Sequence, residues 1–547
     1  MGKKILVCAD IHGALQNFRA AFEAESPLDM VIIAGDLGME ERKIEQVTGV
    51  TACAVVQGNN DRLRCPDLPE KRDFNYEGKR FFVTHGHTRG VRRGVPRQFM
   101  ALTRNLGADI VIFGHSHSYF EETLDGVLYL NPIGEARSNH RYDTSDYLKV
   151  DPILGSNEDF SRLCESAKAL GIRVMLDGVY SHTGDDSVYF NRYGHYPDAG
   201  ACQGDQSPYY GWYDFQQFPE KYRCWWGFDS LPEVEETNSS WQNFVVTGQD
   251  SGVKTWLRRG AGAWRLDVAD ELPDEVLALI RKAAKEEKPD AVVLGEVWED
   301  AVLKEIYGSR RNYALGYSLD SVMNYPLRTA ILDFAHRRCS AYALRDFLIG
   351  QQLNYPKPFY YSLMNLLGSH DVERVRSALA TDIWIKTLSR EDQLKLSFSD
   401  EALERAVELE KLCAVIQFAL PGVPSIYYGD EQGMCGVGDP FNRLPFREER
   451  QDLFAHYAAL SALRNSAPAL STGHVRFAAG SDGILLILRY ITDGQDVFGD
   501  PAENGVYLAA VNRNREDTSY RYDCSDLGLG VIEGCIRGHS GSIRRIL

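Results

Sequence analysis

Short apolar runs, each followed by polar residues and a helix-like stretch, recur along almost the whole chain. In the first 130 residues they occupy positions 5–8, 30–34, 54–57, 81–84, 110–113 and 127–130. This alternation predicts strands connected by helices, which is a layered α/β fold. Five runs end in a polar cluster: ADIHG, GDLG, GNND, THGH and GHSH. Functional residues of α/β sheets lie at strand ends, so these clusters mark a candidate site.

A second series of strand and helix patterns follows. Apolar residues at 160, 163, 164, 167 and 170 repeat at helical spacing, Gly171 is suited to end the helix, and RVMLD (173–177) starts a strand. Parallel strands with crossover helices predict a β/α barrel. Further strand candidates are GAWRLD (262–267), AVVLGE (291–296), GYSLD (316–320), LMNLLGSHD (363–371) and VPSIYYGDE (423–431).

The last part of the chain changes character at about residue 475. Strand-like runs with turn signals predict a small β-sandwich there, and the weak periodicity from Gly530 predicts a frayed tail. The 547 residues exceed the roughly 250–300 at which one hydrophobic core stops growing. We therefore predict three domains, at residues 1–132, 133–472 and 473–547.

Composition narrows the possible partners and compartment. The net charge of −17 disfavours nucleic acids and membrane surfaces. Eleven cysteines without a C-x-x-C pair indicate reduced thiols, and no apolar run reaches about 18 residues. We expect a cytoplasmic protein with no nucleic-acid or membrane partner.

The polar clusters of the first part together form one pattern. Each cluster alone is common in solvated turns, but five in order at strand ends resemble the calcineurin-like metallophosphoesterases, particularly the small bacterial phosphodiesterases. Carboxylate, amide and imidazole ligands suit two divalent ions, for which we expect Mn²⁺. The resemblance implies a small phosphodiester or phosphomonoester substrate and makes Asp36 the bridging ligand. It also assigns Asp10, His12 and His117 to one ion, and Asn59, His85 and His115 to the other.

The second part carries four further motifs in order. LDGVYSH contains Asp177 and His182, GAWRLDVADE contains Arg265 and Asp267, VLGEVW contains Glu296, and NLLGSHD contains His370 and Asp371. From residue 131 to about 515 the chain resembles the α-amylase family of glycoside hydrolases, in its neopullulanase and cyclomaltodextrinase branch. DPFNRLPF extends the likeness beyond these motifs.

The resemblance implies a role for each residue of these motifs. Retaining hydrolysis needs a nucleophile and an acid about 5–5.5 Å apart, which would be Asp267 and Glu296. Asp371, His182 and His370 would hold sugar hydroxyls, and Arg265 would orient the nucleophile. Tyr142 would stack on the sugar, and Asp177 would support that subsite. Ser181 stands where α-amylases often have a calcium-binding Asn, so we predict no calcium ion.

Two aromatic stretches leave their role open. YYGWYDF (209–215) and RCWWGFDSLP (223–232) could form ordinary core or could stack on sugar rings.

The junction between the two parts is a single short motif. LYLNP (128–132) fits both the end of a phosphoesterase and the second strand of an amylase barrel. With it the barrel has seven strands, whereas closure requires eight. We predict a calcineurin-like α/β domain, a (β/α)₈-type barrel without its first βα unit, and a C-terminal β-sandwich. Fusion by recombination and an assembly error both explain the junction.

Three functions remain possible. The first is a bifunctional fusion that hydrolyses α-glucan oligosaccharides and a phosphoester. The second is an active phosphoesterase carrying a non-functional amylase remnant. The third is a sugar-binding module without catalysis, against which Asp267, Glu296 and Asp371 argue.

Overall fold

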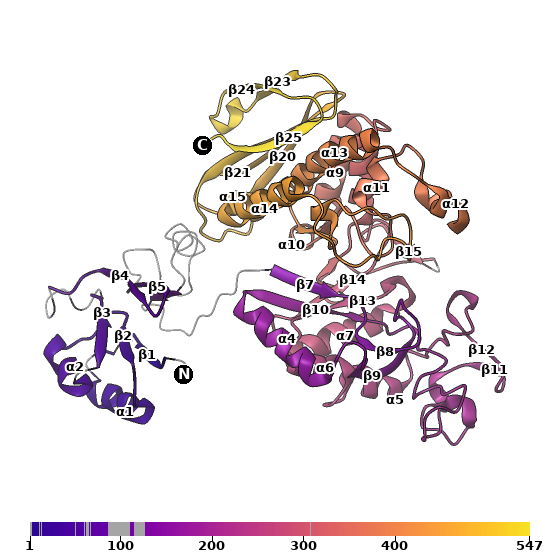
Figure 1. Cartoon of the computed structure of the whole chain (residues 1–547), viewed down its shortest axis with the longest axis horizontal. Coiled ribbons are helices and arrows are strands. Elements are labelled where there is room, and N and C mark those ends of the chain that lie inside the picture. The colour runs from indigo at the N-terminus through magenta and orange to yellow at the C-terminus, as the bar shows by residue number, and fades with distance from the viewer. Residues whose placement is uncertain are drawn as a thin grey trace. The chain divides into compact units, whose positions relative to one another are not determined.

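The computed structural model describes residues 3–9, 11–12, 14–49, 51–58, 61, 65, 67–85, 110–113, 126–306 and 308–547. The chain splits into two compact units (Figure 1). One comprises Met1–Glu121, Asn465–His474 and Tyr490–Gly505, and the other Glu122–Arg464, Val475–Arg489 and Val506–Leu547. The predicted bounds at 132 and 472 stay predictions.

The first unit contains a parallel sheet in the order β1-β2-β3 and a second sheet in the order β4-β5-β6. The central strand β2 is buried on both faces: Val31 and Ile33 join one apolar core, and Met30 and Ile32 join the other. The elements are β1 (Ile5–Cys8), α1 (Leu15–Glu25), β2 (Met30–Ile33), α2 (Glu41–Thr48), β3 (Ala52–Val55), β4 (Lys71–Tyr76), β5 (Lys79–Thr84) and β6 (Ile110–Phe113).

Strand β4 was not predicted from the sequence. It is an edge strand of mostly exposed residues, KRDFNY, that pairs antiparallel with β5. The two-residue loop between them has both Glu77 and Gly78 at positive φ, the conformation that tight hairpins favour. Only Phe74 and Tyr76 of this strand pack against the core, so β4 lacks the longer apolar alternation that would have predicted it.

Seven barrel strands follow one another in the second unit. Five form a sheet in the order β17-β14-β13-β10-β7, a further pair is β18-β19, and one parallel bridge between Met323 and Met364 joins the two groups. The strands are β7 (Gly126–Leu130), β10 (Ile172–Gly178), β13 (Ala263–Leu266), β14 (Val292–Gly295), β17 (Ser321–Val322), β18 (Met364–Leu366) and β19 (Val423–Ser425). All of them pair in parallel, as predicted.

One barrel strand lies later than predicted. GYSLD (316–320) precedes β17 instead of forming it. Gly316 adopts a left-handed φ of 93°, and the carboxylate of Asp320 pairs with Arg281 and Lys285. The turn and these ion pairs occupy the segment, so regular pairing starts only after Asp320.

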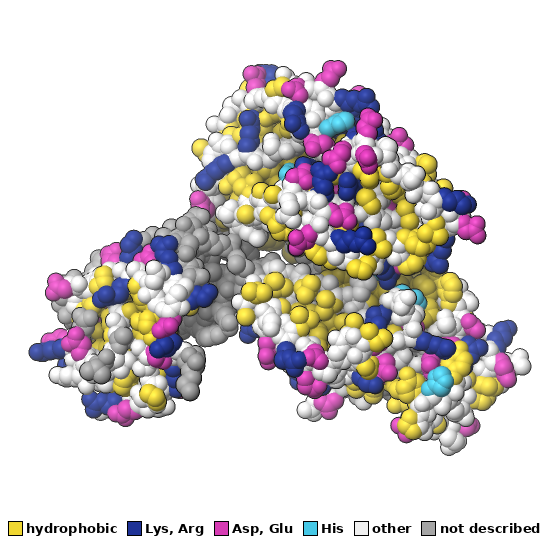
Figure 2. Space-filling model, viewed as in Figure 1, with side chains coloured by type: hydrophobic (Ala, Val, Ile, Leu, Met, Phe, Trp, Pro, Cys, Tyr) yellow, Lys and Arg dark blue, Asp and Glu magenta, His cyan; other side chains and the backbone are white. Residues whose placement is uncertain are grey.

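The barrel is open on one side in the described part of the chain. Strand β7 pairs there only with β10, and β19 only with β18. Apolar side chains at both edges of this opening are exposed. The exposed fraction is 49% for Val127 and 39% for Leu128 at β7, and 50% for Val423 and 39% for Ile426 at or just after β19. Figure 2 shows hydrophobic side chains gathered over β7 and the neighbouring helix α4, whose Leu163 is exposed. In the described residues no further strand pairs with the outer edge of β7 or β19, as a barrel without its first βα unit requires.

Helices cover the outside of the barrel. The predicted helix at 160–170 is α4, which Ser156 and Asp159 cap with reciprocal hydrogen bonds. The helices are α4 (Asn157–Ala169), α5 (Ser239–Gln242), α6 (Gly252–Arg258), α7 (Asp274–Glu287), α8 (Tyr325–Ala335), α9 (Ala341–Asn354), α10 (Lys357–Tyr360), α11 (Val375–Leu379), α12 (Arg390–Lys395), α13 (Asp400–Ala419), α14 (Gln451–Ser466) and α15 (Pro468–Ser471).

Loops and small hairpins extend from the barrel strands. The short strands are β8 (Gly134–Ala136), β9 (Thr144–Val150), β11 (Phe215–Gln217), β12 (Lys221–Tyr222), β15 (Glu305–Ile306) and β16 (Ser309–Arg310). The short helical turns are η2 (Ala201–Gln203), η3 (Tyr210–Trp212), η4 (Trp225–Gly227), η5 (Asn243–Thr247), η6 (Ala269–Glu271), η7 (Ile385–Thr387), η8 (Asp430–Gln432) and η9 (Ser525–Leu527).

The C-terminal part is rich in strands, as predicted. Its sheets have the orders β20-β21-β22-β25 and β23-β24. The frayed tail predicted from Gly530 is wrong, because β25 pairs with β22 and its Gly541 lies against Val415 of α13. The strands are β20 (His474–Ser481), β21 (Ile484–Ile491), β22 (Gly505–Asn512), β23 (Thr518–Asp523), β24 (Val531–Ile536) and β25 (Ser540–Arg545).

None of the helices in the described ranges is long and apolar enough to span a membrane.

Candidate active site

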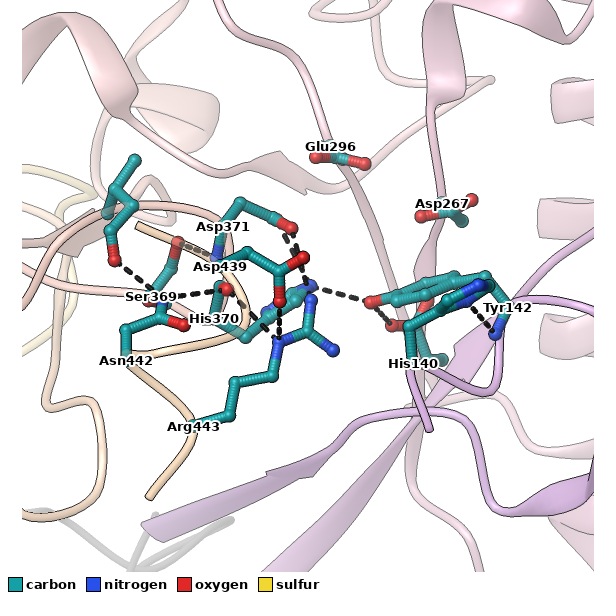
Figure 3. Close-up of polar contacts among 12 residues, drawn as sticks. His140, Tyr142, Asp267, Glu296, Ser369, His370, Asp371, Asp439, Asn442 and Arg443 are labelled. Carbon is teal, nitrogen blue, oxygen red and sulfur yellow. Dashed lines mark hydrogen bonds and ion pairs between the residues drawn. The ribbon is translucent and has the colours of Figure 1, made fainter. Parts of the chain in front are cut away.

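Four carboxylates lie at the same end of the barrel strands. Asp177 is on β10, Asp267 directly follows β13, and Glu296 directly follows β14. Asp371 stands on the loop after β18, opposite Asp267 and Glu296 (Figure 3). Parallel strands present their carboxyl ends at one rim of a barrel, so residues far apart in sequence converge there.

Arg265 holds three of these carboxylates together. Its side chain is 1% exposed, and its Nη1 lies 2.7 Å from Asp177 Oδ1 and 2.8 Å from Asp267 Oδ1. Its Nη2 lies 2.7 Å from Glu296 Oε2, as an ion pair. Asp267 and Glu296 therefore contact neighbouring nitrogens of one guanidinium, which keeps the two carboxylates close.

Burial raises the pKa of three of these carboxylates, those of Asp177, Asp267 and Asp371. It raises the pKa of Asp177 and, more strongly, that of Asp267, against the opposing charge of Arg265. Burial and the charge of Glu296 raise the pKa of Asp371 to about 7.

The Glu296 side chain is fixed by two donors. The backbone N–H of Val268 donates to Oε2 at 2.9 Å, and the Trp298 indole donates to Oε1 at 3.1 Å. Val268 adopts φ 38° and ψ 60°, a left-handed conformation that is strained for a β-branched residue. The strained backbone of Val268, the residue after Asp267, directs its N–H at Glu296.

Tyr142 and His370 meet between the carboxylates. The Tyr142 hydroxyl lies 2.9 Å from Asp177 Oδ2 and 2.6 Å from His370 Nε2. His370 Nε2 is also 3.0 Å from Asp371 Oδ2. Burial, with the charges of Arg265 and Arg443, holds the pKa of His370 well below its usual range, so the imidazole is neutral.

His182 is a further neutral imidazole. Burial lowers its pKa to about 3, and its Nδ1 lies 3.0 Å from the hydroxyl of Ser181. Its buried Nε2 has no hydrogen-bond partner among the described residues, so it can bind a ligand hydroxyl. Ser181 orients the imidazole, and the expectation of no calcium ion remains untested.

The structure brings together all eight predicted residues of this site and adds others. The Tyr129 hydroxyl donates to Asp177 Oδ2 at 2.5 Å, and Arg443 pairs with Asp439 at 2.6 Å and approaches Asp371 at 3.9 Å. The sequence held signals for these residues. Tyr129 lies in the predicted strand at 127–130, and Asp439 and Arg443 belong to DPFNRLPF.

The two aromatic stretches lie in different environments. Trp212 and Tyr213 of the first stretch are buried core. In the second, Trp226 is 72% and Phe228 55% exposed, and both stack on Trp225. The Trp225 ring centroid lies 5.4 Å from that of His182. We call Trp225, Trp226 and Phe228 the aromatic platform.

Three of the seven predicted metal ligands lie in the described part of the first unit. His12 N donates to the Asp36 carbonyl at 2.9 Å, and His85 Nε2 lies 3.5 Å from Asp36 Oδ2. His85 Nδ1 is 2.8 Å from the Ala34 carbonyl, the outer contact that usually orients a metal-binding imidazole. Among the described residues, no group of three or more His, Cys, Asp or Glu side chains is placed to hold a metal ion, so the predicted metal site stays a prediction. Asp10, Asn59, His115 and His117 lie outside the described residues.

Known families account for both parts of the chain. Residues 118–444 match the family model "Alpha amylase, catalytic domain". The chain belongs to the α-amylase family. Residues 4–151 match the model "Calcineurin-like phosphoesterase superfamily domain". The two matches overlap over residues 118–151, a range that includes β7.

Relatives of the amylase part are α-glucan hydrolases. An amylopullulanase of Thermoanaerobacterium saccharolyticum is 36% identical over 76% of this chain and 34% of its own length. A cyclomaltodextrinase of Geobacillus thermopakistaniensis is 33% identical over 71% of this chain and 59% of its own length. The chain thus spans a third to three fifths of these relatives.

A solved structure shares this fold. It is the cyclic α-maltosyl-(1→6)-maltose hydrolase of Arthrobacter globiformis in complex with that cyclic sugar. The TM-score is 0.63 at 26% identity, over 82% of this chain and 89% of the other.

Proposed function

We propose that the barrel hydrolyses α-glucosidic bonds of maltooligosaccharides or related α-glucans with retention of configuration. The contact of one buried guanidinium with Asp177, Asp267 and Glu296 carries this proposal. It supplies a nucleophile and an acid held close together, which retention requires. The α-glucan hydrolases among the relatives support the substrate class.

The proposed reaction has two steps. Asp267 attacks the anomeric carbon while Glu296 gives its proton to the departing glycosidic oxygen, which leaves a glycosyl ester on Asp267. Glu296 then takes a proton from water, which attacks the same carbon and releases Asp267. Asp371, His182 and His370 bind sugar hydroxyls, and Tyr142 stacks on the ring.

The test is release of reducing sugar from maltohexaose and cyclodextrin, with the anomeric product followed by NMR. Asp267→Ala should remove hydrolysis by several orders of magnitude, and Glu296→Gln should reduce it by about 10²–10⁴-fold. Maltooligosaccharide binding should persist in both variants, since it uses other contacts. Undiminished hydrolysis by Asp267→Ala would refute the assignment.

A second activity is supported by the paired Asp36 and His85 of the first unit. We propose a two-metal phosphoesterase with His12, Asp36 and His85 among the ligands, acting on a small phosphodiester or phosphomonoester. Bound divalent ions would supply a hydroxide nucleophile and neutralise the phosphate. Asp36 would bind both ions.

This activity should depend on added Mn²⁺ and disappear in Asp36→Asn, whereas the exposed Asp73→Asn should keep it. If EDTA-treated protein still cleaves a nitrophenyl phosphodiester at the full rate, the proposal is wrong. Glucan hydrolysis should survive the chelator, because the amylase chemistry uses carboxylates alone. If only the phosphodiester assay responds, the barrel is a non-functional remnant.

A further inference from the structure

Asn442 binds the loop that carries His370 and Asp371. Its side chain is fully buried, and its Nδ2 lies 2.7 Å from the Val372 carbonyl, 2.8 Å from that of His370 and 3.3 Å from that of Ser369 (Figure 3). Three carbonyl oxygens around one atom require that atom to be the amide nitrogen, since an oxygen there would be repelled.

Asn442 is itself held in place from the protein interior. The buried Arg374 donates from Nε to the Asn442 carbonyl at 2.9 Å, and its backbone N–H donates to the Gly436 carbonyl at 3.0 Å. A Cβ on Gly436 would lie 2.7 Å from Asn442 Cα, so glycine is needed for this approach. Arg374 is anchored in turn by Asp430, at 3.0 Å.

The loop after β18 needs such support. Among the described residues, β18 has one regular neighbour, β19, and a single bridge to β17. Of these strands, β19 borders the open side of the barrel. Buried carbonyl groups require donors. Besides Asn442, Arg443 donates from Nε to the His370 carbonyl at 3.3 Å.

We propose that Asn442 is a positioning residue, which fixes His370 and Asp371 against the bound sugar by holding three carbonyls of their loop. The effect on turnover rests on the proposed glycoside hydrolysis; the effect on the loop does not. Misplacement of catalytic groups by about 1 Å can cost about 10²-fold in rate. Asp267 and Glu296 are held separately by Arg265, so loss of Asn442 should leave them in place.

The test compares Asn442→Ala and Asn442→Asp with the same changes at Asn512. Asn512 is equally buried, and its Nδ2 likewise binds two carbonyls, those of Glu516 and Ile536, in the C-terminal sheet. All four variants, at Asn442 and at Asn512, should have a lower unfolding temperature than the wild-type chain. Only the Asn442 variants should speed amide hydrogen exchange of residues 368–374, by roughly tenfold or more.

Kinetics provide the second measurement. In the Asn442 variants kcat for maltohexaose should fall about 10²-fold with KM within about threefold, and Asn512 variants should keep both. Asn442→Asp should be at least as damaging as Asn442→Ala, whereas a space-filling role would make the near-isosteric Asp the milder change.

The outcomes separate the two proposals. Unchanged exchange at 368–374 in both Asn442 variants, or equal kcat losses at Asn442 and Asn512, overturns the positioning role. If exchange increases as expected but the wild-type chain releases no sugar, Asn442 positions the loop and the proposed glycoside hydrolysis fails.

Discussion

Asp371 couples the chemistry of the site to stability. Its pKa rises from an ordinary 3.8 to about 7 on folding, because burial and the charge of Glu296 disfavour its ionised form. The folded state therefore binds this proton more tightly than the unfolded state. The protonation of Asp371 therefore contributes to the free energy of unfolding in full below pH 4, and this contribution is lost as the pH rises to about 7.

Asp371→Asn should remove this loss. The free energy of unfolding of the variant, minus that of the wild-type chain, should increase by on the order of 2 kcal/mol between pH 5 and pH 8. Thermal unfolding at both pH values measures it. The control is Asp452→Asn, because Arg450 and Lys411 lower the pKa of Asp452, so this change should destabilise the protein above pH 4. Parallel stability–pH curves for Asp371→Asn and wild type would contradict this prediction.

Individual site residues were predictable where a motif carried them. Asp267 and Glu296 each directly follow a strand, Asp371 lies on the loop after β18, and the structure brings the three together. Asn442 lies 71 positions after Asp371 within DPFNRLPF, so the family likeness marked its segment, but neither periodicity nor strand position gave the residue a role. Its contacts are to backbone carbonyls, which any sequence provides.

The turn η4 presents the aromatic platform. Trp226 has φ 49° and is followed by Gly227 at φ 82°, so a left-handed turn holds the indole outward. Its Nε1 donates to Glu271 at 3.2 Å, and its ring stacks on Trp225 at 5.0 Å. An exposed, immobilised indole that stacks on Trp225, the neighbour of His182, is suited to stack on a sugar of a bound oligosaccharide.

Trp226→Ala should therefore raise KM for maltohexaose about 3–10-fold with little change in kcat, since stacking stabilises bound substrate and transition state alike. Tyr342→Ala is the matched control. Tyr342 is also exposed but lies in the first turn of α9, where the N–H of its neighbour Ala341 donates to the Asp482 carbonyl of the C-terminal part. Equal KM for wild type and Trp226→Ala would exclude the platform from substrate binding.

At the level of elements, apolar strands were predicted and polar ones were not. The buried β2 is a continuous apolar run, whereas β4, β24 and β25 expose much of their length and carry little signal. These strands form because a neighbouring strand offers hydrogen bonds, and this information lies elsewhere in the chain.

For the whole molecule, β7 is the decisive segment. Both family models include it, yet in the structure it pairs with β10 of the barrel. The shared motif LYLNP was recognisable from the sequence. Which partner the strand takes depends on tertiary competition, which no local pattern encodes.

The open side of the barrel leads to the last prediction. Strands β7 and β19 offer unpaired edges in the described structure, and Val127, Leu128, Val423 and Ile426 are 39–50% exposed. Completing their burial would contribute about 3–5 kcal/mol before new strand hydrogen bonds are counted. The chain as it stands should be prone to aggregation, with weak glycosidase activity.

Adding a first strand and helix from a related amylase ahead of Gly126 should raise both soluble yield and glucan hydrolysis. The matched control is the same insertion with two prolines in the strand, which cannot pair with β7 and β19 and should give no gain. Phosphodiester cleavage should be unaffected by either insertion, because its predicted ligands all precede Gly126. A native chain that is monomeric, unfolds cooperatively and turns over maltohexaose as fast as the completed barrel would show that the open side costs nothing.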